Sequence, residues 1–174
     1  MTVHDIRFLG DPVLREKAKR VPTIDASIHH LIEDMIDSMR AANGVGLAAP
    51  QIGVSLRLIV IGLPDEEPFA LINPEIVKRS GQRTVEEGCL SLPGYRTENL
   101  MRSLTVVARG LDPSGRMVRV KGKDNLLAQA LEHEIDHVNG ILYVDHLESK
   151  DDLIKIEPPP GPKEEPARPS RSGG

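Results

Sequence analysis

Apolar residues recur with helical spacing in two long segments of the chain. Over about residues 25–42 they fall at i, i+3 and i+4 positions, which is typical of an amphipathic helix. Asn43 and Gly44 follow, and both tolerate the left-handed backbone with which many helices end. The same period returns over about residues 124–139, followed by Gly140. The pattern predicts one long helix near the N-terminus and another near the C-terminus.

Between these helices, short runs rich in apolar and β-branched residues are separated by Gly, Pro and Asp. Residues 112–115 read Asp-Pro-Ser-Gly, which is typical of a hairpin turn. The predicted strands are residues 56–61, 69–72, 76–78, 83–86, 104–109 and 117–121. A helix, a series of strands and a second helix predict an α+β domain with a largely antiparallel sheet.

Length and composition fit one globular domain followed by a tail. The chain has 174 residues, of which 39% are hydrophobic, and this is enough to build a core without disulfides. Residues 158–174 differ, because they hold six of the 14 prolines and no apolar period. We therefore expect one domain over residues 1–157 and a Pro-rich, disordered or extended tail over residues 158–174, with a partner-binding segment as the alternative.

Charge and residue usage exclude several classes of protein. The net charge of −4 argues against a dedicated nucleic-acid binder, although it leaves room for a local basic patch. Aromatic residues make up 2%, which argues against base-stacking surfaces. The single cysteine, Cys89, fits a reducing compartment. The N-terminal residues lack the apolar core of a signal peptide, and the longest apolar run, residues 58–63, cannot span a membrane. We expect a cytoplasmic protein without a membrane partner.

The predicted C-terminal helix carries the sequence His-Glu-Ile-Asp-His. Its two histidines, His133 and His137, are at i and i+4, so both can bind one metal ion. Glu134 lies about 60–100° around the helix from them, where it can reach a metal-activated water as general base and then general acid. Leu126 and Ala130 share the histidines' side, which predicts a partly apolar cavity. Two ordinary helix histidines with a solvated glutamate are the alternative.

A catalytic site of this kind needs a third protein ligand. Cys89 is the only thiol, and it lies in a segment punctuated by Gly and Pro just after a predicted strand. His146 and Glu148 follow the second histidine, but neither fits the H-x-x-G-x-x-H extension of the usual zincins. Cys89 is therefore the favoured third ligand, with an inert small hydrophobe as the alternative.

A third unusual segment, residues 44–51, holds two glycines and two alanines, which indicates close approach of backbones. Its last residue, Gln51, could donate an amide N–H to an oxyanion. The segment has no Lys and precedes no phosphate-binding helix, so it is not a P-loop. A tight link between a helix and a strand is the alternative.

Residues 44–51, 87–91 and 133–137, in this order, strongly resemble the bacterial peptide deformylases. They match the family patterns G-x-G-L-A-A-x-Q, E-G-C-L-S and H-E-x-D-H, and the resemblance extends over about residues 6–147. It implies mostly antiparallel sheets packed around a central C-terminal helix that carries the H-E-x-x-H pattern. It also implies an activity, the metal-dependent removal of the N-formyl group from the initiator methionine of new polypeptides.

The resemblance gives the matching residues their roles. Cys89, His133 and His137 would bind the metal, and Glu134 would be the acid and base. The metal that the family prefers in cells is Fe(II), with Ni, Co or Zn as substitutes. The chemistry of the three side chains is compatible with these metals, because thiolate and imidazole ligands suit several of them.

The resemblance also implies how the substrate is held. Gln51 and the backbone N–H of Leu90 would form an oxyanion hole, and the peptide would lie as an added strand in a groove. The substrate-binding residues implied in this way are Val45, Gly46, Arg96 and Leu126. The expected partner is an N-formyl-methionyl nascent peptide, with no nucleic-acid specificity.

The chain departs from the family pattern at three places. Glu132 stands where many members have Gln, and the helical wheel places it on the polar side, away from the metal. Gln129 is more polar than the aliphatic residue often found there. Some members end in a basic helix thought to dock on the ribosome. Residues 147–157 are short and mixed in charge, so the sequence does not predict that docking mode, and the ribosome is kept as a candidate partner.

Two other classes of protein share some of these features. An ordinary metallopeptidase has H-E-x-x-H but normally takes a His or acidic third ligand. A structural metal site would need a fourth protein ligand, for which His146 is the nearest candidate. Glu134 and Gln51 argue against such a silent module, because neither is needed to hold a metal.

Overall fold

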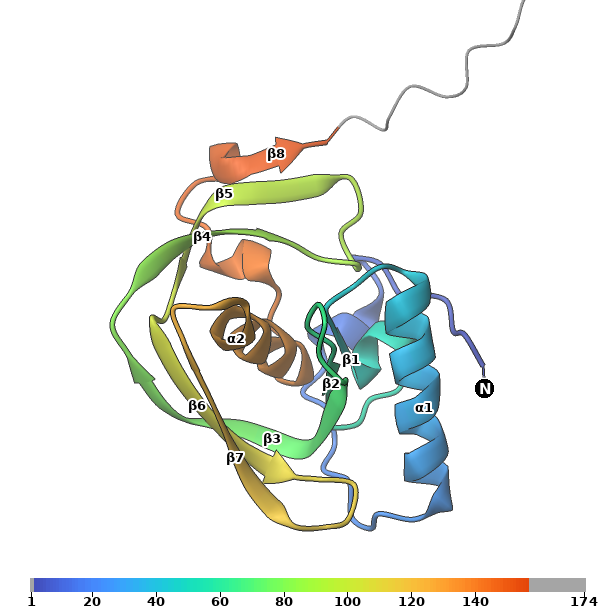
Figure 1. Ribbon diagram of the computed structural model, residues 1–174. Coiled ribbons are helices and arrows are strands. Elements are labelled where there is room, and N and C mark those ends of the chain that lie inside the picture. Colours follow the sequence, from blue (N-terminus) through green and yellow to red (C-terminus); the bar gives the residue numbers. More distant parts are fainter. Residues whose placement is uncertain (1, 157–174) are drawn as a thin grey trace, which may run out of the picture.

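The computed structural model describes residues 2–156, so the expected tail at residues 158–174 lies outside the described part (Figure 1). Both predicted long helices are present, as α1 (Ala26–Ala41) and α2 (Leu126–Val138). Each begins after a capping residue, Asp25 or Asn125, whose side chain accepts a hydrogen bond from the backbone N–H three residues later. No helix within residues 2–156 combines the length and apolar character needed to cross a membrane.

The strands form two antiparallel sheets. The first has the order β1-β2-β3-β6-β7 and the second the order β4-β5-β8. Their bounds are β1 Gly46–Ala48, β2 Leu58–Ile61, β3 Phe69–Ser80, β4 Arg83–Gly88, β5 Tyr95–Arg102, β6 Thr105–Leu111, β7 Met117–Lys123 and β8 Leu153–Lys155. Short 3-10 helices lie at Pro12–Arg15, Ala49–Ile52, Tyr143–His146 and Lys150–Asp152. The α+β class and the antiparallel pairing agree with the sequence.

The strand boundaries differ from the expected ones for local reasons. The sequence separates two strand-like runs at Pro74, but both belong to the single strand β3. The pairing with β6 shifts its register between Ile72 and Glu75, so Pro74, which has no N–H to donate, lies at the irregularity. For residues 44–51 the alternative was a tight link between a helix and a strand. Part of this segment instead forms strand β1, which pairs with β2. The sequence did not predict β5 or β8, whose residues are largely polar or partly exposed.

Helix α2 lies at the centre of the fold, and the long sheet curves around it (Figure 1). Its apolar side packs Leu131 and Ile135 against Val106 and other residues of the sheet. At Gly122 of β7 an added Cβ would lie 2.4 Å from a backbone nitrogen of α2, so glycine allows the close approach of strand and helix. The histidines of α2 are therefore held inside the molecule.

Candidate active site

Three side chains that can bind a metal meet beside α2. They are Cys89, just after β4, and His133 and His137 on consecutive turns of α2, and their donor atoms all lie within 4.8 Å of one another. The Nε2 atoms of the two histidines are 3.2 Å apart, and Sγ of Cys89 is 3.3 Å from Nε2 of His137. His146 is not in this cluster, because its Nε2 binds Asp136.

The spacing and chemistry of these donors fit one divalent ion. Tetrahedral bonds of about 2.0–2.3 Å to nitrogen and sulfur separate the donor atoms by roughly 3.3–3.6 Å. The separations of 3.2 Å and 3.3 Å from Nε2 of His137 to the other two donors are close to these values. Three ligands leave a position for water or substrate, as a catalytic site requires. Cys89, His133 and His137 therefore form a candidate site for one metal ion.

Glu87 fixes the orientation of the first histidine. Its Oε2 lies 2.8 Å from Nδ1 of His133, so that ring turns Nε2 toward Cys89. Burial alone would raise the pKa of Glu87, but hydrogen bonds and charges from His133 and Arg102 lower it to about 2. A carboxylate that stays ionised accepts a hydrogen bond from Nδ1–H of His133, which leaves the Nε2 lone pair free for a metal.

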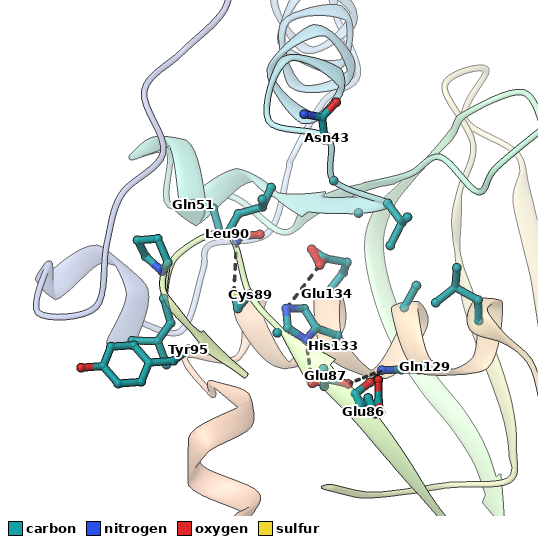
Figure 2. Close-up of a pocket in the computed structure, with 18 of the residues that line it drawn as sticks. Asn43, Gln51, Glu86, Glu87, Cys89, Leu90, Tyr95, Gln129, His133 and Glu134 are labelled. Carbon is teal, nitrogen blue, oxygen red and sulfur yellow. Dashed lines mark hydrogen bonds and ion pairs between the residues drawn. The ribbon is translucent and has the colours of Figure 1, made fainter. Parts of the chain in front are cut away.

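Glu134 lies beside the cluster and is not one of its three members. The carboxylate is buried, with Oε1 at 3.7 Å from Nε2 of His133 and with no protein partner for Oε2 within residues 2–156. Burial raises the pKa of Glu134 to about 7. An added Cβ at Gly46 would lie 2.9 Å from Cγ of Glu134, so glycine in β1 leaves room for the carboxylate. Figure 2 shows Glu134 next to His133 in the pocket.

Gln51 is buried in the 3-10 helix after β1, and its amide is held at both ends. Its Oε1 accepts a hydrogen bond from Ala48 N at 2.9 Å, and its Nε2 donates to Ser91 Oγ at 3.1 Å and lies 3.6 Å from Sγ of Cys89. The backbone N–H of Leu90 donates to no acceptor within residues 2–156. Two N–H donors therefore lie beside the donor cluster.

A pocket of about 450 Å³ opens over these groups. Val45 and Leu126 line it and are 36% and 40% exposed, so they stand at its rim, and Gly46 and Ala130 lie deeper. The remaining expected substrate residue, Arg96, does not line this pocket, and its guanidinium pairs with Glu98 on the surface of β5. The pocket is also lined by Asn43, Gly44, Tyr95, Gln129 and Ile156.

Behind the cluster lies a buried network of charges that the sequence did not reveal. Arg102 of β5 bridges Glu87 at 2.6 Å and Asp136 at 2.9 Å, and Asp136 also binds His146 at 2.8 Å. Glu87 belongs to a motif that the sequence singles out, but its role depends on partners far away along the chain. Arg102 lies in none of the motifs that the sequence analysis identifies.

Two polar residues of α2 make contacts that the helical wheel does not show. Glu132 does lie away from the donor cluster, but it is buried, and its carboxylate accepts from Ser103 N at 2.7 Å and binds Arg79. Gln129 donates to the backbone oxygen of Glu86 at 2.7 Å and to Glu87 at 3.1 Å. Protein thus covers much of the polar side of α2. Hydrogen bonds and ion pairs to neighbouring strands and to Ser103 compensate the burial of these polar side chains.

Loss of Arg102 should destabilise the protein strongly. In Arg102→Met, the carboxylates of Glu87 and Asp136 would stay buried without their cation, and we expect the free energy of unfolding of the metal-free protein to fall by about 3–5 kcal/mol. Urea unfolding measures this change. Arg40→Met, at an exposed position, is the control and should change stability by under about 0.5 kcal/mol. Equal stability of the two variants would contradict this account.

Known proteins share both the sequence and the fold. The family model described as polypeptide deformylase matches residues 3–152. A peptide deformylase of Dehalococcoides mccartyi is 58% identical over 159 residues, which cover 91% of this chain and 94% of that protein. One of Thermomicrobium roseum is 48% identical over 164 residues, covering 90% and 92%.

Solved structures agree with these relatives. The crystal structure of a peptide deformylase from Legionella pneumophila superimposes with a TM-score of 0.81 at 48% identity, covering 84% of this chain and 87% of that one. That of a peptide deformylase from Synechococcus elongatus in complex with actinonin gives 0.82 at 41% identity, covering 86% and 83%. This chain therefore belongs to the peptide deformylase family, metal-dependent hydrolases that remove the N-formyl group from nascent peptides.

Proposed function

We propose that Cys89, His133 and His137 hold the metal of this deformylase and that Glu134 moves the protons of the reaction. One observation carries this proposal: three metal donors and a buried, unpaired carboxylate oxygen converge at one pocket. The metal, when bound, polarises the formyl oxygen and lowers the pKa of water toward neutrality. Thiolate and imidazole donors suit Fe(II), which we propose as the metal in the cell, with Zn, Ni or Co as substitutes.

In this proposal Glu134 acts first as a base and then as an acid. Its carboxylate takes a proton from the attacking water as a bond forms between the water oxygen and the formyl carbon. It then gives that proton to the amine nitrogen as the C–N bond breaks, and formate leaves. Burial raises the pKa of Glu134 in the metal-free site, and a bound cation would lower it again, so burial and the metal together would set its readiness to take and return a proton.

Gln51 and the Leu90 N–H would stabilise the oxyanion that forms on the formyl oxygen. Because Ala48 and Ser91 hold the Gln51 amide before substrate arrives, little reorganisation is needed. We expect Gln51→Leu to lower kcat by about 10²–10³-fold with unchanged metal content. Steady-state kinetics of formate release tests this, with the same substitution at exposed Gln82 as control. A Gln51→Leu protein as active as Gln82→Leu would remove Gln51 from the oxyanion hole.

The substrate would lie along the rim of the pocket. We propose that Val45 and Gly46 of the β1 edge pair with the peptide backbone, and that Leu126 and His133 help to wall the methionine side chain. Arg96 would reach the substrate backbone only after leaving Glu98, its partner here. We further propose a cytoplasmic enzyme that meets nascent chains at the ribosome, with residues 1–157 as the catalytic domain and 158–174 as a tail.

Formate release from an N-formyl-Met-Ala-Ser peptide tests the function. Protein would be loaded without oxygen with Fe(II), Ni(II) or Zn(II), alongside a chelated sample. We expect formate with each metal and none after chelation, with the Fe(II) form losing activity in air because the thiolate ligand oxidises, and the Zn form weaker but durable. Cleavage of unformylated peptides without formate would indicate a metallopeptidase instead. An Fe(II) form that keeps its activity in air for days would contradict the metal assignment.

A further inference from the structure

The outer face of the long sheet is strongly basic, although the chain as a whole carries a net charge of −4. Paired residues of an antiparallel ladder share a face, and the register brings three rows of side chains across β3, β6 and β7 to the side away from α2. The rows are Ser80–Thr105–Lys123, Lys78–Val107–Lys121 and Glu75–Arg109–Arg119. Five cations thus share this face with one carboxylate.

Most of these cations are exposed and make no ion pair within residues 2–156. Arg109 pairs with Glu75, whereas Lys78, Arg119, Lys121 and Lys123 form no salt bridge in the described part of the chain. By contrast, Arg79 points to the opposite face and binds Glu132 of α2. The outer face therefore holds positive charge that no acidic side chain pairs within residues 2–156.

The basic face continues into a small hollow of about 180 Å³ at the end of β3 and β6. Arg20 and Arg57 line this hollow together with Arg109 and Glu75. Arg57 is partly buried, and its pKa is lowered by that burial. Asp112, just after β6, accepts hydrogen bonds from the backbone N–H groups of Ser114 and Arg116 within the β6–β7 turn. The three rows and the hollow share Arg109 and Glu75, and we call the two together the basic sheet face.

We propose that the basic sheet face binds the phosphate backbone of RNA. Cations two residues apart on one strand are separated by about 6.8 Å and those on neighbouring strands by about 4.8 Å, so several can contact successive phosphates. The face has no aromatic residue, which excludes base stacking and points to duplex backbone. A membrane surface is less suitable, because Met117 is the one large apolar side chain that is mostly exposed here.

RNA is the fitting polyanion because the substrates of this family are nascent peptides, which emerge from an RNA-rich particle. The pocket lining includes no residue of β3, β6 or β7, so RNA on the basic sheet face leaves the pocket open. An enzyme held in this way would keep its pocket free for the emerging N-terminus. The RNA contact itself does not depend on the catalytic roles proposed above.

Binding of full-length metal-loaded protein to a fluorescein-labelled 20-base-pair RNA duplex tests the proposal. Anisotropy at 50 and 200 mM salt should give a Kd of about 10⁻⁶–10⁻⁴ M that weakens steeply with salt. In Arg119→Glu/Lys121→Glu, affinity at 50 mM salt should fall at least tenfold, and the salt slope should fall by about 2. Formate release should be unchanged, which separates this proposal from the catalytic one.

A matched control makes the result specific. Lys17→Glu/Arg40→Glu reverses the same amount of charge at exposed positions outside the basic sheet face, and its affinity should fall less than threefold. The proposal is overturned if both variants lose affinity equally, because binding would then follow net charge alone. It is also overturned if the wild type does not bind the duplex at 50 mM salt, or binds phosphatidylglycerol vesicles through the same residues and not RNA.

Discussion

A Glu134→Gln protein is expected to hold its metal and yet release formate about 10²–10⁴-fold more slowly than the wild type. Gln has nearly the shape of Glu, but its amide cannot take a proton from water or return one to the leaving amine. The carboxylate is buried next to Gly46, with one oxygen free of protein partners within residues 2–156, so the substitution removes proton transfer and little else.

Two measurements separate this effect from a loss of the site. Metal analysis of the purified variant should give wild-type stoichiometry, because Glu134 is not one of the three clustered donors. Glu148→Gln, the same change at an exposed position, should keep wild-type kinetics. A metal-replete Glu134→Gln enzyme with the wild-type rate would contradict the role of Glu134 as acid and base.

The parts of the fold that the sequence predicts are those set by local pattern. The periods around residues 25–42 and 124–139 predict both helices. The strands that were missed lack such a pattern. Strand β5 is mostly polar, and its buried positions include Thr97 and Arg102, so no alternation of apolar and polar residues marks it in the sequence.

The candidate active site also has a part that the sequence predicts and a part that only the fold shows. Cys89, His133 and His137 come from motifs with a defined spacing, and the structure brings their donors together. The supporting contacts escape sequence reasoning, because a helical wheel treats every polar position as exposed. Asp136 is instead buried against Arg102, which lies 34 residues away along the chain, so only the tertiary fold shows the pair.

Cys89→Ser should abolish detectable formate release by removing the metal. The serine hydroxyl is a poor ligand near neutral pH, and two histidines alone leave the ion weakly held. Because a ligand that binds only the folded state stabilises it, chelation should lower the wild-type Tm, by the equivalent of about 4 kcal/mol if free metal exceeds its Kd a thousandfold. The Tm of Cys89→Ser should already be low, and chelation should not lower it further.

His146→Ala decides between Cys89 and the other candidate for the third ligand. His146 Nε2 binds Asp136 and lies outside the donor cluster, so this variant should keep its metal even if its stability falls. Metal analysis after gel filtration therefore gives opposite results for the two candidates. If His146→Ala lost the metal and Cys89→Ser kept it, the site would be a zincin-like centre with a histidine ligand, and the assignment of Cys89 would be wrong. If Cys89→Ser alone loses it, the cysteine completes the centre.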